Sequence, residues 1–181
     1  MTHPDPVELE FSFPVDVDGL PVSGRTYSIA AGPDESEKVA ARLGLISLPL
    51  LKAEINLVPS GRDMVRVTGT VEADVVQQCV VSLAPVEAHL HETFDRMFQR
   101  ALDPRHQTDD LPLDDDIPDL IEGGKIDIGE VVVEHLALVI DPYPRAPGAI
   151  FEAGGAGEEA KNQPDSPFAV LAKLKSSTKN N

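Results

Sequence analysis

Few side chains in this sequence have the type and spacing that chemistry requires. Cys79 is the only cysteine, and His89 and His91 stand two residues apart, on one face of an expected strand, where they could hold a metal as a pair. A metal centre needs several converging N or S ligands, and Glu87 shares the parity of the two histidines, which favours a solvent-facing surface. A lone cysteine beside a strand bend is typically a small buried side chain. We therefore predict no metal site and no cysteine nucleophile.

Acidic residues gather in a proline-containing stretch that we expect to form a solvated loop over residues 103–122. Carboxylate oxygens are the ligands that Ca²⁺ prefers, but the EF-hand order of ligands, glycine and terminal Glu is absent. The loop is instead a candidate partner-binding segment, through Asp109, Asp110, Asp114, Asp115 and Asp116.

Motifs of catalysis and of phosphate binding are missing from the sequence. It contains no G-x-S-x-G elbow, no H-E-x-x-H pair and no G-x-x-x-x-G-K-[ST] loop. Paired carboxylates could in principle hydrolyse a sugar, but the chain has no Trp to stack on one. The sequence predicts a protein that is not an enzyme, with no catalytic residue and no cofactor.

The charge balance narrows the class of partner. Thirty-one acidic residues against fifteen basic ones give a formal charge of −16. Affinity for nucleic acid depends on Lys and Arg neutralising phosphates, so direct contact with RNA is disfavoured and DNA is not expected as a partner. The same field attracts a basic protein, although it would also serve simply to keep the chain soluble.

The sequence gives no sign of export or of membrane insertion. Its N-terminus lacks the basic and apolar regions of a signal peptide. The longest apolar-rich segment, Val131–Ile140, is interrupted by Glu134 and His135 and is too short to span a bilayer. A single cysteine excludes an intramolecular disulfide. We expect a cytoplasmic protein that does not contact membranes.

The elements that must position these residues are mainly strands. Residues 64–100 alternate apolar and polar side chains on both sides of a break near Cys79 and Pro85, which predicts an antiparallel pair with the cysteine near its bend. Before the break, the apolar residues Val65, Val67, Val71, Ala73 and Val75 fall on odd-numbered positions; after it, Val86, Ala88 and Leu90 fall on even-numbered ones. Weaker alternation predicts further strands over Val7–Val17, Arg25–Ala30 and Leu51–Leu57, and Phe94, Met97 and Phe98 are expected where the last strand bends.

Helices are predicted where apolar residues recur at helical spacing between capping residues. One begins at Gly32-Pro33 and ends at Gly44. A second has Asp127 as its N-cap and is predicted over Ile128–Ile140, before Asp141-Pro142 stops it. The expected fold is α+β, with an antiparallel, partly barrel-like sheet, two or three flanking helices and a tethered C-terminal helix.

Domain boundaries follow from changes in composition. Residues 1–150 are predicted to form the single α+β domain, and residues 151–165, rich in Gly and Glu, a flexible linker. Residues 166–176 are predicted to form a short amphipathic helix that docks on its own domain or binds a partner. Its apolar stripe makes Phe168, Leu171 and Leu174 candidate contact residues.

The order of several segments is familiar. Cys79–Val86 is followed by Phe94 and Phe98, then by the acidic stretch, Ile126–Leu138, Asp141–Pro144 and finally Ser166–Leu171. This order resembles the bacterial family of large ribosomal RNA subunit accumulation proteins (YceD-like), which also occurs in chloroplasts. The likeness spans roughly Glu37 to Leu174.

The chain departs from the family pattern in its cysteines. Many members carry a second Cys three positions after the first and another pair after the helix, a set that would suit zinc. Here Ser82 holds the second position, and Arg145-Ala146-Pro147-Gly148 stands where the later pair would fall. The resemblance therefore carries no metal role to this chain and leaves Cys79 without partners.

The resemblance implies a non-catalytic ribosome-biogenesis factor needed for accumulation or processing of large-subunit (23S) ribosomal RNA. The charge favours action through a basic ribosomal protein or rRNA-processing factor. Two other functions stay open: a divalent-ion-dependent hydrolase or RNA-processing enzyme that uses the acidic loop, and a direct RNA-binding module.

Overall fold

A computed structural model of the chain describes residues 9–61, 63–100 and 118–150. The chain divides into two units, Met1–Pro147 and Gly148–Asn181, and the account below concerns the first. The predicted linker over residues 151–165 and the predicted helix over residues 166–176 lie outside the described residues, as does the predicted acidic loop up to residue 117.

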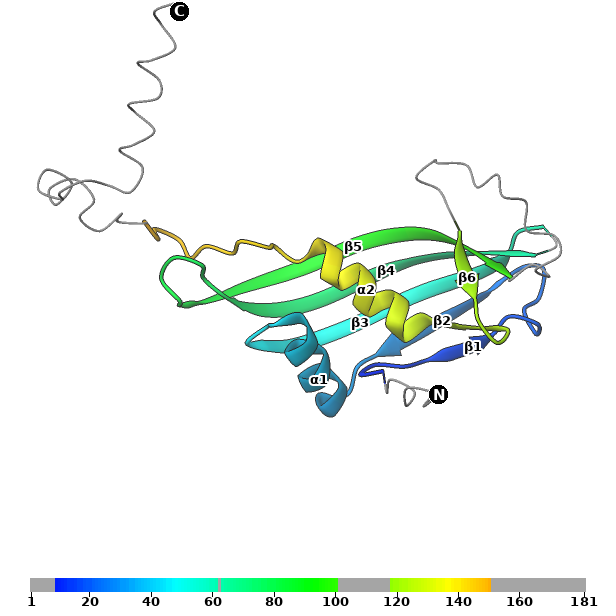
Figure 1. Ribbon diagram of the computed structural model, residues 1–181, viewed down its shortest axis with the longest axis horizontal. Coiled ribbons are helices and arrows are strands. Elements are labelled where there is room, and N and C mark those ends of the chain that lie inside the picture. Colours follow the sequence, from blue (N-terminus) through cyan, green and yellow to red (C-terminus); the bar gives the residue numbers. More distant parts are fainter. Residues whose placement is uncertain (1–8, 62, 101–117, 151–181) are drawn as a thin grey trace, which may run out of the picture. The chain divides into compact units, whose positions relative to one another are not determined.

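Two sheets and two helices make up the described part of the chain (Figure 1). The larger sheet has the strand order β2-β3-β4-β5-β6, and β1 pairs with β7 in a separate ribbon. In chain order the elements are β1 (Pro14–Asp16), β2 (Arg25–Ala30), α1 (Pro33–Leu43), β3 (Ser47–Pro59), β4 (Met64–Gln78), β5 (Pro85–Arg100), β6 (Asp119–Ile121), β7 (Lys125–Asp127) and α2 (Ile128–Val139).

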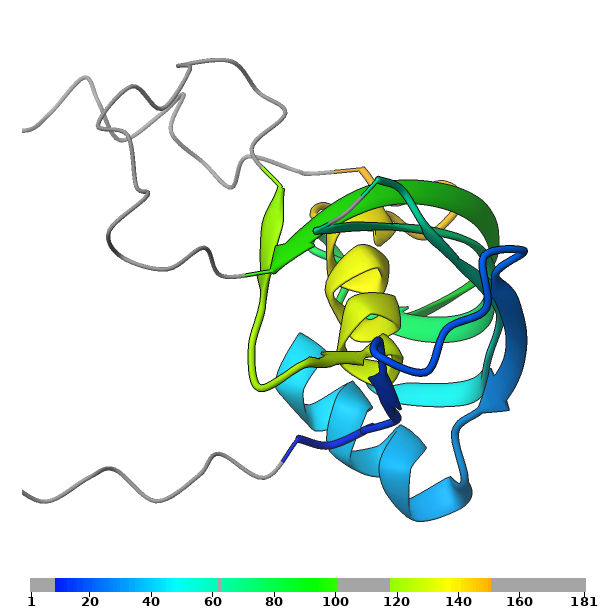
Figure 2. The ribbon, with the colours of Figure 1, turned by 90° about the vertical axis from the view of Figure 1, so that its right-hand side faces the viewer.

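The α+β class is confirmed, but the sheet is neither a barrel nor wholly antiparallel. Strands β2 to β5 are antiparallel, whereas β5 and β6 are parallel. The sheet curves around α2 (Figure 2), yet β2 and β6 stand at its two ends and do not pair with each other. The prediction of a partly barrel-like, antiparallel sheet is corrected to an open, mixed sheet with a curved face.

The predicted alternation places the core on the face that α2 covers. Val65, Val67, Val71, Ala73 and Val75 are all buried, because every second side chain of a strand points to the same face. Buried residues of α2, such as Val132 and Leu136, lie in the same apolar core as these strand residues. The core is aliphatic apart from Phe11, Phe94 and Phe98.

A glycine in β4 makes room for a phenylalanine ring of the core. Gly69 pairs with Phe94 across the β4–β5 ladder. A Cβ atom at Gly69 would lie 2.7 Å from the Phe94 ring and 3.0 Å from the carbonyl oxygen of Glu54. The ring therefore occupies the space that a side chain would take, which explains a glycine inside a strand.

Both predicted helices form with the expected ends. The Glu35 carboxylate accepts the N–H of Gly32 at 2.7 Å, and Gly44 closes α1 in a left-handed conformation with φ of +66°. Asp127 is the N-cap of α2, as predicted.

Three predictions about where strands begin, end or occur were wrong. The strand predicted over Val7–Val17 is, in its described residues, only β1, because its pairing depends on the short strand β7. Phe94, Met97 and Phe98 lie within β5 rather than at its bend, since the strand runs to Arg100. The end of the predicted acidic loop holds β6, which pairs with Phe98–Arg100.

Candidate interaction surface

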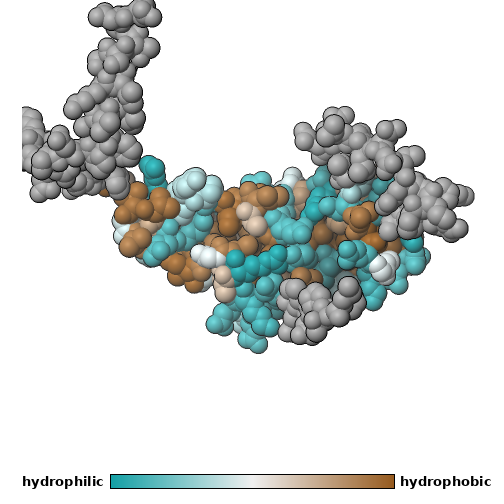
Figure 3. All heavy atoms as spheres, in the orientation of Figure 1, coloured by the Kyte–Doolittle hydropathy of each residue, from teal (hydrophilic) through white to brown (hydrophobic). Residues whose placement is uncertain are grey.

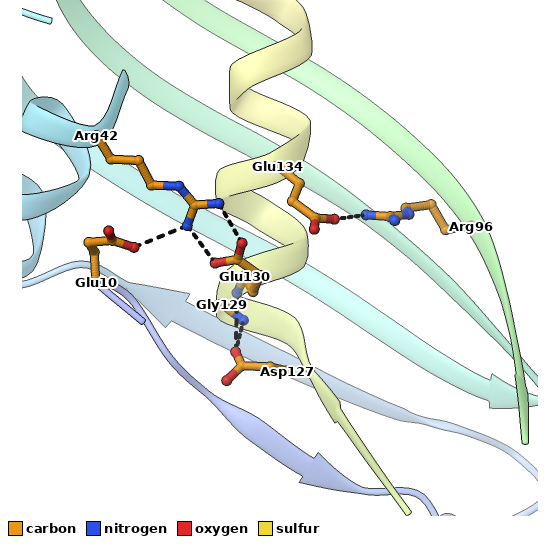
Figure 4. Close-up of polar contacts among 7 residues, drawn as sticks. All are labelled: Glu10, Arg42, Arg96, Asp127, Gly129, Glu130 and Glu134. Carbon is orange, nitrogen blue, oxygen red and sulfur yellow. Dashed lines mark hydrogen bonds and ion pairs between the residues drawn. The ribbon is translucent and has the colours of Figure 1, made fainter. Parts of the chain in front are cut away.

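Asp127 fixes the start of α2 against the N-terminal segment. Its carboxylate accepts the backbone N–H groups of Gly129 at 3.0 Å and Glu130 at 3.1 Å (Figure 4). It also accepts the hydroxyl of Ser12 at 2.5 Å and the N–H of Phe13 at 2.8 Å. Four donors on two segments therefore meet at one carboxylate, which makes Asp127 a structural residue.

Two arginines tie α2 to its neighbours (Figure 4). Arg42 on α1 donates to both carboxylate oxygens of Glu130, at 2.8 Å and 2.6 Å, and to Glu10 at 3.0 Å. Arg96 on β5 bridges Glu134 on α2 at 2.6 Å and Asp119 on β6 at 2.7 Å.

The partners of Arg96 hold it in its charged form. Burial lowers the pKa of Arg96, but Glu134 and Asp119 together more than offset this, so its pKa lies above the usual value. Its guanidinium also lies 5.4 Å from the centroid of the Phe98 ring. Arg42 and Arg96 are therefore occupied in holding the fold together.

Cys79 is buried in the turn between β4 and β5, as its sequence context predicted. Its Sγ accepts the N–H groups of Ala146 at 3.2 Å, Ser82 at 3.3 Å and Val81 at 3.4 Å. These donors, led by Ala146 and then Ser82, lower the pKa of the Cys79 thiol to about 6, although burial opposes them. The sulfur is thus an anionic acceptor that ties the turn to the segment after α2.

The tip of this turn is held in an unusual conformation. Leu83 has φ of +61°, the left-handed region that an L-residue with a branched side chain rarely adopts, and its side chain is 66% exposed. Val80 beside it is half-exposed and donates its N–H to the carbonyl of Pro144 at 2.9 Å. With the exposed Tyr143, these residues leave large apolar and aromatic side chains exposed at the β4–β5 turn. Figure 3 shows brown, hydrophobic atoms at this end of the molecule.

His135 lies on the side of α2 that faces the core, where its ring packs beside that of Phe94. Its ring stands 5.1 Å from that of Phe94, and its Nε2 is buried with no hydrogen-bond partner in the described part of the chain. Burial lowers the pKa of His135, so the ring is neutral near pH 7.

The face of the sheet that points away from α2 is polar and acidic. We call it the outer face and define it by the polar side chains of β2 to β5 that alternate with the buried ones. Its hydroxyl and amide groups come from Thr26, Ser28, Asn56, Thr68, Thr70 and Thr93; its carboxylates from Glu54, Glu72, Asp74, Glu87 and Asp95; and its basic groups from Lys52, Arg66, His89 and His91.

Cations on the outer face are already paired. Lys52 lies 2.8 Å from Glu72, and Arg66 forms an ion pair with Asp95. Glu54 and Glu87 have no cationic partner among the described residues, so the outer face keeps an excess of negative charge. Two shallow hollows of about 630 Å³ lie on it, one lined by Ser28, Glu54 and His91 among others and one by Thr26, Asn56 and Asp95 among others.

His89 and His91 lie on the outer face, with Glu87 in line, as the sequence indicated. Nδ1 of His89 is 2.7 Å from the carboxylate of Asp74. Over residues 9–61, 63–100 and 118–150, no group of three or more Cys, His, Asp or Glu side chains is arranged to hold a metal ion. No helix in these ranges is long and apolar enough to cross a membrane.

The candidate residues predicted from the sequence fall elsewhere. Asp109, Asp110, Asp114, Asp115, Asp116, Phe168, Leu171 and Leu174 all lie outside the described residues, so their role stays a prediction. Sequence reasoning missed the outer face as a surface, although the alternation in β4 and β5 already separated its polar residues from the core. It also missed Leu83, because a left-handed conformation at a leucine has no sequence signal.

The described part of the chain is thus an α+β fold with an acidic, open sheet face and a helix laid across the opposite face. The family model described as "Large ribosomal RNA subunit accumulation protein YceD" matches residues 67–175. The chain therefore belongs to this family, which confirms the resemblance seen in the sequence. Comparison with curated proteins and with solved structures gives no significant match.

Proposed function

We propose that this protein is a non-catalytic ribosome-biogenesis factor that promotes accumulation of 23S ribosomal RNA in the cytoplasm through contacts with a basic protein. The observation that carries the proposal is the family match over residues 67–175, which includes most of β4 and all of β5 and α2. The basic partner is a protein of the large subunit or an rRNA-processing factor.

The surface chemistry supports a protein partner over RNA. RNA binding requires a basic path for the phosphates, whereas Lys52 and Arg66 on the outer face are each bound to a carboxylate. Glu54 and Glu87 remain available to lysine and arginine side chains of a partner, and the formal charge of −16 speeds encounter with such a protein.

Affinity purification after RNase treatment tests the partner class. The full chain should retain basic large-subunit proteins at low salt, and the yield should fall as salt rises, because exposed charges are screened. A parallel gel shift with large-subunit RNA fragments should show no binding at physiological salt. Tight RNA binding together with loss of all protein partners after RNase would contradict the proposal.

Removal of residues 164–181 separates the roles of the tail and of the described domain. The same proteins should be recovered without the tail if the outer face is the main contact. Loss of every partner would assign binding to Phe168, Leu171 and Leu174 instead.

A further inference from the structure

Strand β5 has a long free edge. It runs from Pro85 to Arg100 and pairs along its whole length with β4, but β6 pairs only with Phe98–Arg100 (Figure 1). In the described residues, no backbone group is hydrogen-bonded to the other side of β5 between Glu87 and Asp95. These nine positions span about 30 Å at the usual rise of a strand.

The hydrogen bonds at the two ends of the hairpin show which residues face the free edge. The N–H of Arg100 donates to the carbonyl of Asp63, and the N–H of Cys79 donates to the carbonyl of Ala84. The register of β4 and β5 between these two pairs has no bulge. Hydrogen-bonded and non-hydrogen-bonded pairs alternate in an antiparallel ladder, so the even-numbered residues of β5 bond to β4. The N–H and C=O groups of Glu87, His89, His91, Thr93 and Asp95 therefore point outward.

This edge lacks the features that would block a basic strand. Natural edges are protected by charged side chains, especially lysine, by proline or by a bulge. Between Pro85 and Asp95 there is no lysine, no arginine and no second proline. Glu87 and Glu92 are exposed and have no cationic partner in the described residues. An acidic edge repels a second copy of the same edge and suits a basic strand.

We propose that the free edge of β5 over Glu87–Asp95 binds an extended, lysine- or arginine-rich segment of the partner protein by adding it as a strand to the sheet. Backbone hydrogen bonds from the outward groups supply the binding, and the carboxylates of Glu87 and Glu92 select the basic side chains. This inference rests on the proposed function for the identity of the partner, and the geometry of the edge can be tested without it.

The probe is a ten-residue peptide that alternates lysine and valine, with a glutamate–valine peptide as its charge control. Amide hydrogen exchange is followed residue by residue by NMR on the full chain. The lysine peptide should slow exchange at Glu87, His89, His91, Thr93 and Asp95 at least tenfold. Ala88 and Leu90 should exchange slowly with or without peptide, since β4 already binds them. The glutamate peptide should change nothing.

A matched pair of proline substitutions tests the backbone contact. His91→Pro removes one outward N–H and no bond to β4, so the chain should stay folded and bind the lysine peptide at least tenfold more weakly. Ser28→Pro removes an outward N–H from β2, the strand at the other end of the sheet. The N–H of Ala31 donates to the carbonyl of Leu51, so odd-numbered residues of β2 bond to β3 and even-numbered ones point to the free edge of β2. This substitution should leave binding unchanged.

Three results would overturn the inference. The first is slow exchange at the outward amides of the free chain, because another segment of the chain would then cover the edge. The second is binding of the lysine peptide without protection of these amides, and the third is equal binding by the wild-type and His91→Pro chains. None of them contradicts the proposed function, which is tested separately by affinity purification of the wild-type chain after RNase treatment.

Discussion

Cys79 stabilises the β4–β5 turn as a thiolate that accepts three backbone N–H groups. Its pKa is about 6 in the folded chain, against 9.0 for a free thiol, so the folded state favours the deprotonated form. A depressed pKa adds stability that is complete above the unfolded value and is lost as the pH falls through the folded value.

Cys79→Ala should therefore lower the free energy of unfolding by an amount that depends on pH. The difference from the wild-type chain should be largest near pH 9, shrink between pH 9 and pH 6, and level off below pH 6. Urea unfolding of both chains across this range measures it. A difference that is constant with pH would show that the sulfur acts only by packing, and a folded Cys79→Ala chain should still support rRNA accumulation.

The carboxylate of Asp127 accepts backbone N–H groups both from the first turn of α2 and from the N-terminal segment. Asp127→Ala should lower the free energy of unfolding by about 1–2 kcal/mol, the upper range for loss of an N-cap, because donors on both segments lose their acceptor. Asp127→Asn, which keeps an acceptor oxygen, should cost less. Denaturant unfolding of the two variants tests this, and equal stability of Asp127→Ala and wild type would refute it.

At the scale of elements, the β4–β5 pair depends on the fit between Gly69 and the ring of Phe94. Gly69→Ala should cost about 1–3 kcal/mol, since the new methyl group overlaps the ring and a neighbouring carbonyl. Combining it with Phe94→Leu should cost less than the sum of the two single changes, because the smaller side chain makes room. Strict additivity in this double-mutant cycle would show that the ring does not set the cost.

The elements that the sequence predicted well are those with local signals. The parity of residues 64–78 placed the core side chains of β4, and Asp127 and Gly44 marked helix ends because capping is a contact within a few residues. The elements it missed depend on distant pairing. Strand β6 has three residues in an acidic context and forms by lying parallel to β5, which no local pattern records. The same holds for the bridge from Arg96 to Asp119 and Glu134.

On the scale of the whole molecule, the two faces of the sheet have different roles. The face toward α2 holds the aliphatic core, and the arginines that surround it are paired with carboxylates. The outer face keeps unpaired carboxylates and is not covered by either helix of the described chain (Figure 2). Under the proposed function, this second face contacts the basic partner through carboxylates such as Glu54 and Glu87.

The ratio of 23S to small-subunit rRNA tests this account most directly. It is measured in a bacterium whose own family member has been deleted and which expresses this protein or a variant. The wild-type chain and a control with Asp34→Lys and Glu37→Lys, two exposed residues of α1, should restore the ratio. A chain with Glu54→Lys and Glu87→Lys should stay folded and fail to restore it, because a basic partner is then repelled. Full restoration by the Glu54→Lys, Glu87→Lys chain would contradict the claim that the protein acts through the acidic outer face.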